Sequence, residues 1–227
     1  MCDDTRTRVL NAAGPIFAEK GFHRATVREI CRAAGVNVAS INYHFGDKER
    51  LYIETVKRAR QARVAQAPLP SAHPDDPPEE RLEAFVHTML MRMIGIEEPP
   101  WQWKLMMREI LQPTKAFEEM IDEYFLPEFH MLLDILDELL PPDVPEHTRT
   151  QVGLGIIGQC LFYRIAANVI QMMIPAEERA RHYSVDELTR HICRFTLAAL
   201  EQSTTPRTRD EPSEVSVCDE SATDELA

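Results

Sequence analysis

Glycine is scarce in this chain, which has only 8 glycines among its 227 residues. The strong helix formers Ala, Leu, Glu, Arg and Met dominate instead. Hydrophobic residues make up 44% and charged residues 27% of the chain, which is usual for a globular protein. The composition therefore favours an all-α fold.

Paired cysteines are also lacking, and we expect no leader segment. Five cysteines are scattered without a C-x-x-C pair, and their odd number favours reduced thiols over a disulfide framework. No charged-then-apolar segment with a small-residue cleavage site follows Met1. We therefore expect a cytoplasmic protein. The cysteines are Cys2, Cys31, Cys160, Cys193 and Cys218.

Catalytic and metal-binding motifs are missing as well. The chain has eight histidines but no H-E-x-x-H motif and no Cys/His cluster, and His191 with Cys193 supplies too few ligands for a zinc site. No G-x-S-x-G or comparable nucleophile motif is present. We therefore expect no enzyme activity, no metal and no cofactor.

A glycine motif at residues 153–158 has the letters G-x-G-x-x-G of a dinucleotide site. That site needs a strand before the motif and a helix that begins at it, so that pyrophosphate meets free N–H groups. Here the glycines lie inside a run that is predicted to be helical. Gly and Ala at these spacings favour close contact between helices, at a dimer interface.

The same run, residues 152–174, is apolar on nearly every side and long enough to span a bilayer. Polar residues interrupt it, and a central Arg costs about 2.5–3.5 kcal/mol in a membrane. A helix buried in its own bundle and against a second subunit explains the pattern better. The interrupting residues are Gln159, Arg164, Asn168 and Gln171.

Charge is distributed unevenly along the chain. The formal net charge is −12, yet residues 1–66 hold 12 Lys and Arg against 7 Asp and Glu. The remainder holds 13 against 30. A basic N-terminal part on an acidic body indicates a surface that binds a polyanion, although five positive charges can also be a solvated face.

Local signals near the N-terminus predict four helices. Apolar spacing predicts a first helix over 5–20 that stops at Gly21, with a kink or a late start near Pro15. Thr26-Val-Arg-Glu29 is a capping box, so a second helix should begin there and end at Gly35. Asn37 and Asp47 are the expected caps of a third helix to about Phe45 and a fourth to about Gln66.

The rest of the chain divides into helical segments and proline-rich connections. Residues 67–78 contain five prolines and predict a loop. The acidic tail predicts disorder because it has almost no large apolar residue. The predicted helices are 79–97, 101–112, 115–140 with an interruption near Pro127, 148–174, and 184–200 with a Ser184 cap. The predicted domains are 1–62, 63–202 and the tail 203–227.

The spacing from Val27 to Gly46 fits a helix-turn-helix unit. Cys31 and Ala34 are small where the second helix crosses the first, and Gly35 tolerates the positive φ of the turn. Residues 17–30 (FAEKGFHRATVREI), 33–36 (AAGV) and 42–52 (NYHFGDKERLY) closely resemble the DNA-binding domain of the TetR/AcrR family. The stretches around residues 37–45 and 158–164 also resemble the CecR-like branch of that family.

The resemblance implies an all-α homodimer with an N-terminal DNA-binding domain and a helical body that binds a small effector. A recognition helix needs short side chains where it enters the major groove, and Asn and Ser there can pair with bases. Lys48 matches the family's phosphate contact. The predicted DNA-binding residues are Thr26, Arg28, Asn37, Val38, Ala39, Ser40, Asn42, Tyr43, His44 and Lys48.

A methionine- and aromatic-rich set in the middle helices predicts an adaptable apolar effector pocket, although each residue alone could equally belong to an ordinary core. Arg164 is the most informative member, because a charge in an apolar helix needs an acidic partner or an anionic ligand. The predicted effector residues are Trp101, Trp103, Met106, Met107, Phe125, His130, Phe162, Arg164 and Met172, with Tyr163 and Met173 as neighbours.

Together these features predict a ligand-responsive regulator that binds double-stranded, pseudo-palindromic operator DNA as a homodimer, most often as a repressor. We expect no membrane among its partners. Two alternatives stay open at this point. One is a helical enzyme or metal protein that carries a helix-turn-helix, and the other is an interaction module without a specific DNA target.

Overall fold

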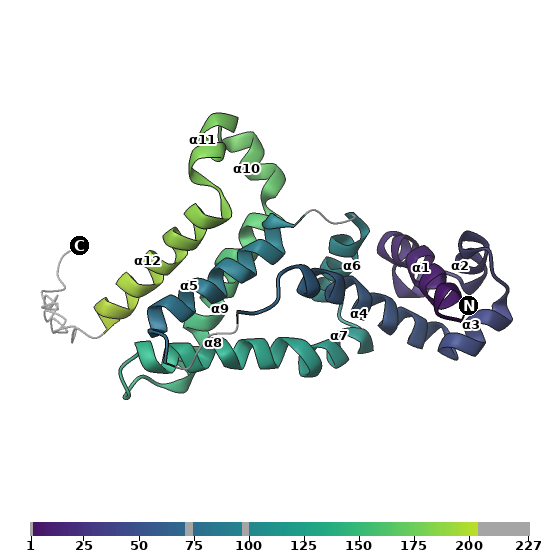
Figure 1. Ribbon diagram of the computed structural model, residues 1–227, viewed down its shortest axis with the longest axis horizontal. Helices are drawn as coiled ribbons and strands as arrows, with labels where there is room; N and C mark the ends of the chain where they lie inside the picture. The colour runs from purple at the N-terminus through teal and green to yellow at the C-terminus, as the bar shows by residue number, and fades with distance from the viewer. Residues whose placement is uncertain (1, 71–74, 97–99, 204–227) are drawn as a thin grey trace, which may run out of the picture.

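The computed structural model describes residues 2–70, 75–96 and 100–203, and every regular element over these residues is helical (Figure 1). The all-α prediction is therefore confirmed. The predicted acidic tail lies almost wholly outside the described residues. The elements are α1 (Cys2–Arg24), α2 (Val27–Ala34), α3 (Val38–Phe45), α4 (Lys48–Gln66), α5 (Pro78–Leu90), η1 (Met91–Gly95), α6 (Pro100–Leu111), α7 (Lys115–Met120), η2 (Ile121–Phe125), α8 (Leu126–Leu139), α9 (Glu146–Ile165), α10 (Ala167–Met173), α11 (Ala176–His182) and α12 (Val185–Ser203).

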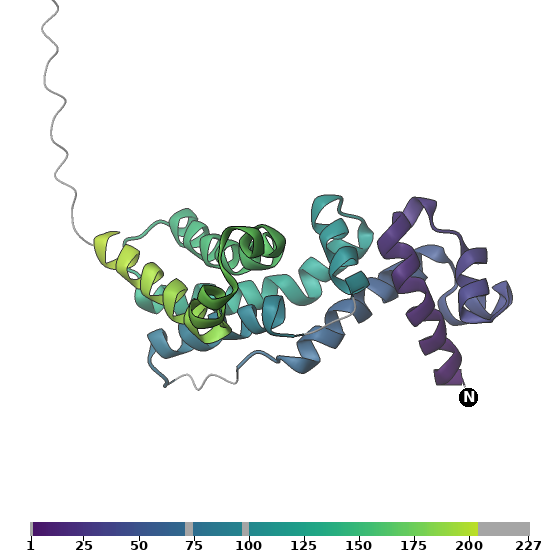
Figure 2. The same cartoon turned by 90° about the horizontal axis from the view of Figure 1, so that it is seen from above.

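The helices form an elongated arrangement with α1, α2 and α3 at one end and α12 at the other (Figures 1 and 2). Helix α4 runs from the N-terminal helices into the body, where α5, α8, α9 and α12 lie together. Helices α10 and α11 project from the body as a separate pair (Figure 1).

Two hydrophobic clusters fill this arrangement. The first joins α1–α4 to α6 and α7, through residues such as Leu105 and Met120. The second joins α5, α8, α9 and α12, with Leu82, Leu132 and Ile192 at its centre. The first cluster thus extends past the predicted boundary at residue 62 and takes in two helices from the middle of the chain.

The expected kink or late helix start near Pro15 is wrong for α1. It begins at Cys2 and passes through Pro15, and the residue with non-helical angles is Gly21, at φ 71°. Pro15 and Asn11 are both exposed, so water can reach the Asn11 carbonyl that lost its helical partner. Gly14, on the buried side, lies against Trp101, where a Cβ would clash with the indole ring.

Two π-helical turns interrupt the middle helices. The first, η1, extends α5 to Gly95. The second, η2, ends two residues before Pro127, which confirms the predicted interruption there. A proline removes a helical hydrogen bond and crowds the preceding turn, and a wider turn relieves that crowding.

The expectation of one continuous helix over 148–174 is wrong. The chain breaks at Ala166, and α9 and α10 meet at an angle of 69°. A run that is apolar on every side has no periodic face, so its sequence gave no sign of where the direction changes. Helix α11 follows and was also not predicted. Within the described residues, no single helix is long and apolar enough to cross a membrane, although α9 and α10 together pass that test by length and composition.

Candidate DNA-binding surface and effector residues

The turn between α2 and α3 is built by local chemistry. The Glu29 amide donates to the Thr26 hydroxyl at 3.3 Å, and the Thr26 amide donates to the Glu29 carboxylate at 3.1 Å, which completes the capping box. Gly35 ends α2 with φ 64°, a left-handed conformation that costs glycine little. The predicted helix-turn-helix is therefore confirmed.

Helix α3 begins with a second side-chain cap. Asn37 Oδ1 accepts from the Ser40 amide at 2.9 Å and from the Ser40 hydroxyl at 3.0 Å. Ile41 is fully buried and Phe45 nearly so. These contacts fix the rotation of α3, because the buried pair turns the opposite face of the helix outward.

The outward face carries most of the predicted base-reading residues. Tyr43 is 79% exposed and Val38 43%, and Ala39 and Asn42 are exposed as well. His44 is half-buried, with its ring 5.1 Å from that of Tyr43. The structure therefore brings these residues together on one small surface with short side chains at its centre.

Lys48 starts α4 beside this surface. Its Nζ lies 4.6 Å from the centre of the Phe22 ring and donates to the His23 carbonyl at 3.3 Å. Partial burial lowers the pKa of Lys48 from its ordinary value. These contacts hold the ammonium at the end of α1, and Thr26 and Arg28 at the start of α2 are exposed.

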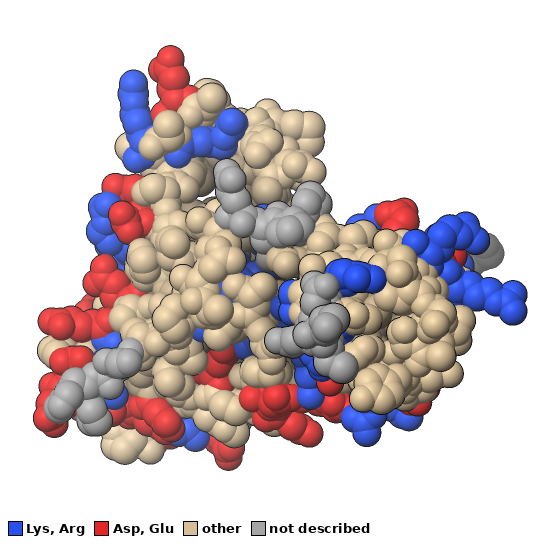
Figure 3. Space-filling view, turned by 45° about the vertical axis from the view of Figure 1, so that its right-hand side comes forward, with Lys and Arg blue, Asp and Glu red and all other residues tan. Residues whose placement is uncertain are grey.

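Charge differs between the two ends of the molecule. Figure 3 shows Lys and Arg gathered on the end that carries α1–α4, whereas Asp and Glu crowd the lower edge of the body. Lys20 pairs with Glu29 and, with Thr26, lowers the pKa of that carboxyl to about 2. The charge asymmetry of the sequence is thus present on the folded surface.

A buried polar network was missed by the sequence analysis. Glu109 on α6 is fully buried, accepts from the Tyr52 hydroxyl at 2.5 Å, and accepts from the Thr114 amide and hydroxyl at 3.2 and 2.8 Å. Burial and the nearby Glu109 raise the pKa of Tyr52. The network ties α4 to α6 beside a cavity of about 300 Å³. One acidic residue in an amphipathic helix gives no sign in the sequence that it will be buried.

The predicted effector residues fall into different environments. Met106 is buried in the first cluster and Trp101 packs against it, whereas Phe162 and Met172 are 57% and 79% exposed. His130 is exposed and Met107 is half-buried. The Arg164 guanidinium lies 4.9 Å from the centre of the Trp103 ring, and Phe125 has the Arg60 guanidinium at 4.5 Å.

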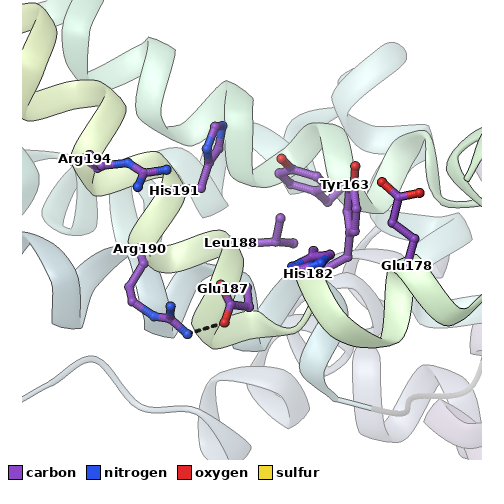
Figure 4. A pocket seen from close by; sticks show the side chains of 9 residues that line it. Tyr163, Glu178, His182, Glu187, Leu188, Arg190, His191 and Arg194 are labelled. Carbon is purple, nitrogen blue, oxygen red and sulfur yellow. Dashed lines mark hydrogen bonds and ion pairs between the residues drawn. The ribbon is translucent and has the colours of Figure 1, made fainter.

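A cavity of about 540 Å³ lies between α9, α11 and α12 (Figure 4). Of the aromatic residues named from the sequence, Tyr163 lines it. Arg190 donates to Glu187 at 2.5 Å on the same wall. The described residues contain no group of three His, Cys, Asp or Glu side chains that could hold a metal ion. Cys31, Cys160 and Cys193 are buried free thiols, as predicted.

Comparison with known proteins assigns both parts of the chain. The model of the tetR family of bacterial regulatory proteins matches residues 9–55. The model of the C-terminal domain of the HTH-type transcriptional dual regulator CecR matches residues 78–200, more than half of the chain. This chain belongs to the TetR family. Its body is of the CecR type, which confirms both resemblances.

Individual relatives are more distant. The chain is 33% identical to the transcriptional regulator UidR of Escherichia coli strain K12 over 85 residues, or 37% of this chain and 43% of UidR. It is 24% identical to the dual regulator CecR of Shigella flexneri over 177 residues, or 74% of this chain and 79% of CecR. The chain therefore spans less than half the length of UidR.

Solved structures share the fold at low identity. A regulatory protein of the tetR family from Rhodococcus RHA1 aligns with a TM-score of 0.59 at 15% identity, over 86% of this chain and 96% of its own. A transcriptional regulator from Rhodococcus sp. Rha1 aligns with a TM-score of 0.57 at 16% identity, over 87% and 96%. These likenesses concern the fold alone.

Proposed function

We propose that this TetR-family chain is a transcriptional repressor that binds operator DNA through α3 and is released by a small-molecule effector. The observation that carries this proposal is the outward face of α3, where Ala39 and Asn42 are exposed while Ile41 and Phe45 are buried. Such a face can enter a major groove about 12 Å wide without a steric barrier. We further propose that it works in the cytoplasm and catalyses no reaction.

The individual DNA contacts follow from the chemistry of each side chain. Asn42 is suited to a bidentate contact with adenine, and Val38 or Ala39 to packing on a thymine methyl group. Lys48, Arg28 and the hydroxyl of Thr26 are suited to phosphate. In the free protein Ser40 and Asn37 hydrogen-bond to each other, so we assign them first to the cap of α3 and second to DNA.

A homodimer would place two such helices on one operator. Helices α9 and α12 expose Leu154, Phe162, Ile165 and Phe195 in the single chain. A Cβ added at Gly155 would meet no atom within 4 Å of the protomer. A second copy packed on this face would complete a four-helix bundle, and two recognition helices about 34–36 Å apart would read successive half-sites.

DNA fragments from around the chain's own gene would test the proposal in gel-shift assays at several salt concentrations. Lys48→Ala should weaken binding to all sequences and reduce the salt slope by about 1, whereas Asn42→Ala should relax specificity at one base pair. Lys57→Ala is the matched control, because Lys57 lies on the same helix and pairs with Glu119 and Glu123. A folded dimer without sequence-specific binding at low salt would refute the proposal.

The dimer interface has its own test. Gly155→Glu should convert the dimer to monomers in sedimentation experiments, since it places a charge in the proposed bundle while leaving the protomer free of clashes. Glu119→Gln, on α7, is the control and should leave the dimer intact. An unchanged sedimentation coefficient for Gly155→Glu would place the interface elsewhere.

A further inference from the structure

Four arginines are linked where α4 enters the body: Glu128 joins two of them, the ring of Trp103 lies near the other two, and the charge of Arg63 acts on Arg92. Arg60 and Arg63 lie on α4, Arg92 lies in η1 and Arg164 on α9. We call these residues, with Glu128 and Trp103, the arginine cluster. Arginine is seldom buried without a partner, so a cluster of this kind requires a reason.

Glu128 holds two of these arginines through one oxygen. Its Oε1 lies 2.6 Å from the Arg60 guanidinium and accepts from Arg92 at 2.9 Å. Arg92 is only 3% exposed, and its Nε donates to the Ala67 carbonyl at 2.6 Å. Two positive charges therefore share one carboxylate oxygen, in a place where Arg92 is buried and Arg60 and Glu128 are only slightly exposed.

The pairing with Glu128 leaves some N–H groups of Arg60 and Arg92 without an acceptor in the described part of the chain. The second terminal nitrogen of Arg92 and the Nε of Arg60 are among several buried arginine nitrogens, two of Arg81 included, that have no hydrogen-bond partner within the described residues. Burial lowers the pKa of Arg92, and the charges of Arg60 and Arg63 lower it further. A buried charged donor without an acceptor costs free energy, and an anion bound there would recover it.

Aromatic rings lie close to these arginines. The Arg60 guanidinium lies 4.5 Å from the centre of the Phe125 ring and 5.3 Å from that of Tyr124. The centre of the Trp103 ring lies 4.9 Å from the Arg164 guanidinium and 5.7 Å from that of Arg63. Flat apolar surfaces beside cationic donors are suited to an organic acid rather than to a bare inorganic anion.

Both π-helical turns of the described chain supply residues to this cluster. Arg92 belongs to η1, and Tyr124 and Phe125 belong to η2, which is followed by Glu128. Such turns are less stable than an α-helix and occur frequently at functional sites. Their coincidence here is independent of the charge argument and points to the same site.

We propose that the arginine cluster binds the carboxylate of an organic monoacid, with Arg60 and Arg92 as its donors and Trp103, Tyr124 and Phe125 as its apolar walls. This inference rests on the proposed function, because it names the chemical class of the effector. The bound carboxylate competes with Glu128 for Arg60. Since Arg60 lies on α4, whose first residue is Lys48, binding shifts the helix that carries the DNA-binding end.

Direct binding to the full chain tests the site without DNA. Trp101→Phe leaves Trp103 as the only tryptophan, so its fluorescence reports on the cluster. Octanoate, benzoate and inorganic phosphate would be titrated in turn. Saturable binding of octanoate or benzoate with a Kd below about 1 mM supports the proposal. Saturation by phosphate alone, or by none of the three, overturns it.

Two variants separate a ligand site from a structural ion pair. Arg60→Met should weaken carboxylate binding at least about tenfold, whereas Arg81→Met should not. Arg81 is the matched control, since its side chain is 11% exposed against 10% for Arg60 and pairs with Glu138 elsewhere in the body. Equal effects of the two variants would contradict the proposal.

Glu128→Gln gives the sharpest outcome. It removes the internal competitor, so a carboxylate should bind about tenfold tighter and raise the melting temperature more than it does in the wild type. A purely structural pair predicts lower stability with no response to carboxylate, and that result would overturn the site. Gel shifts performed in parallel keep the two proposals apart, because failure to bind carboxylate leaves the DNA result unaffected.

Discussion

Two carboxylates sit at the junction between the DNA-binding end and the body, and they are held in opposite ways. Glu109 is surrounded by neutral donors, the Tyr52 hydroxyl and the amide and hydroxyl of Thr114. Glu128 instead faces two guanidiniums. Both contact α4, one near its beginning and one near its end. Glu109 accepts three hydrogen bonds from neutral groups, whereas Arg60 and Arg92 both approach the single oxygen Oε1 of Glu128.

This difference separates a fixed contact from an adjustable one. Exchanging the neutral hydrogen bonds of a buried carboxylate such as Glu109 is unfavourable, because each lost bond leaves a buried group unpaired. A carboxylate shared by two cations can be displaced by another anion at small cost. The four predictions below test the contrast, beginning with the largest expected effect.

Glu128→Gln should lower the free energy of unfolding by about 3 kcal/mol, because Arg60 and Arg92 then lack a counter-charge in a buried place. Urea denaturation followed by circular dichroism measures the change. The matched variant Glu54→Gln removes one partner of the exposed Arg6–Glu54 pair and should leave stability near that of the wild type. Equal losses of unfolding free energy in Glu128→Gln and Glu54→Gln would contradict the prediction, because the buried pair would then contribute no more than the exposed one.

Tyr52→Phe should cost about 2 kcal/mol, since Glu109 loses a hydrogen bond that no solvent replaces. Addition of acetate or octanoate should not restore stability, in contrast to Glu128→Gln. Thermal melts with and without added carboxylate provide the comparison. Recovery of Tyr52→Phe by an anion would remove the proposed distinction between the two sites.

Gly35→Ala should cost about 1 kcal/mol, because the turn requires φ 64° and an L side chain is strained there. A Cβ at this position meets no atom within 4 Å, so the effect isolates backbone strain. The loss should be the same with and without added carboxylate, and it should not depend on the hydrogen bonds of Glu109 or Glu128. Double-variant denaturation with Tyr52→Phe measures this, and additive losses are expected.

Glu29→Gln should have the smallest effect and a distinct pH dependence. Lys20 and Thr26 lower the pKa of the folded carboxyl from 4.5 to about 2, so its stabilisation is present above pH 4.5 and lost as the pH falls toward 2. The difference in melting temperature between wild type and variant should therefore narrow over that range. A constant difference would mean that the capping box does not depend on the charge.

The DNA-binding end could be predicted from the sequence because its signals are local. The caps at Thr26, Asn37 and Asp47 and the left-handed Gly35 are each determined by a few neighbouring residues. Which residues read which bases remains a prediction.

The body could not be predicted to the same depth because its features depend on packing between distant segments. The break at Ala166 lies inside a run with no polar face, and the burial of Glu109 depends on Tyr52, 57 positions earlier. Arg164 was expected to need a partner, but nothing in its own helix indicated Trp103. The predicted effector residues and domain boundaries likewise remain predictions.

Helix α4 runs from the DNA-binding end, at Lys48, to the arginine cluster, at Arg63. From Lys48 to Arg63 it spans about 22 Å at 1.5 Å per residue. A tilt of about 5° at the Arg63 end displaces the Lys48 end by about 2 Å. Base-specific hydrogen bonds tolerate only a few tenths of an ångström around roughly 2.9 Å. A tilt of a few degrees in α4 is therefore enough to misalign the base contacts of the DNA-binding end.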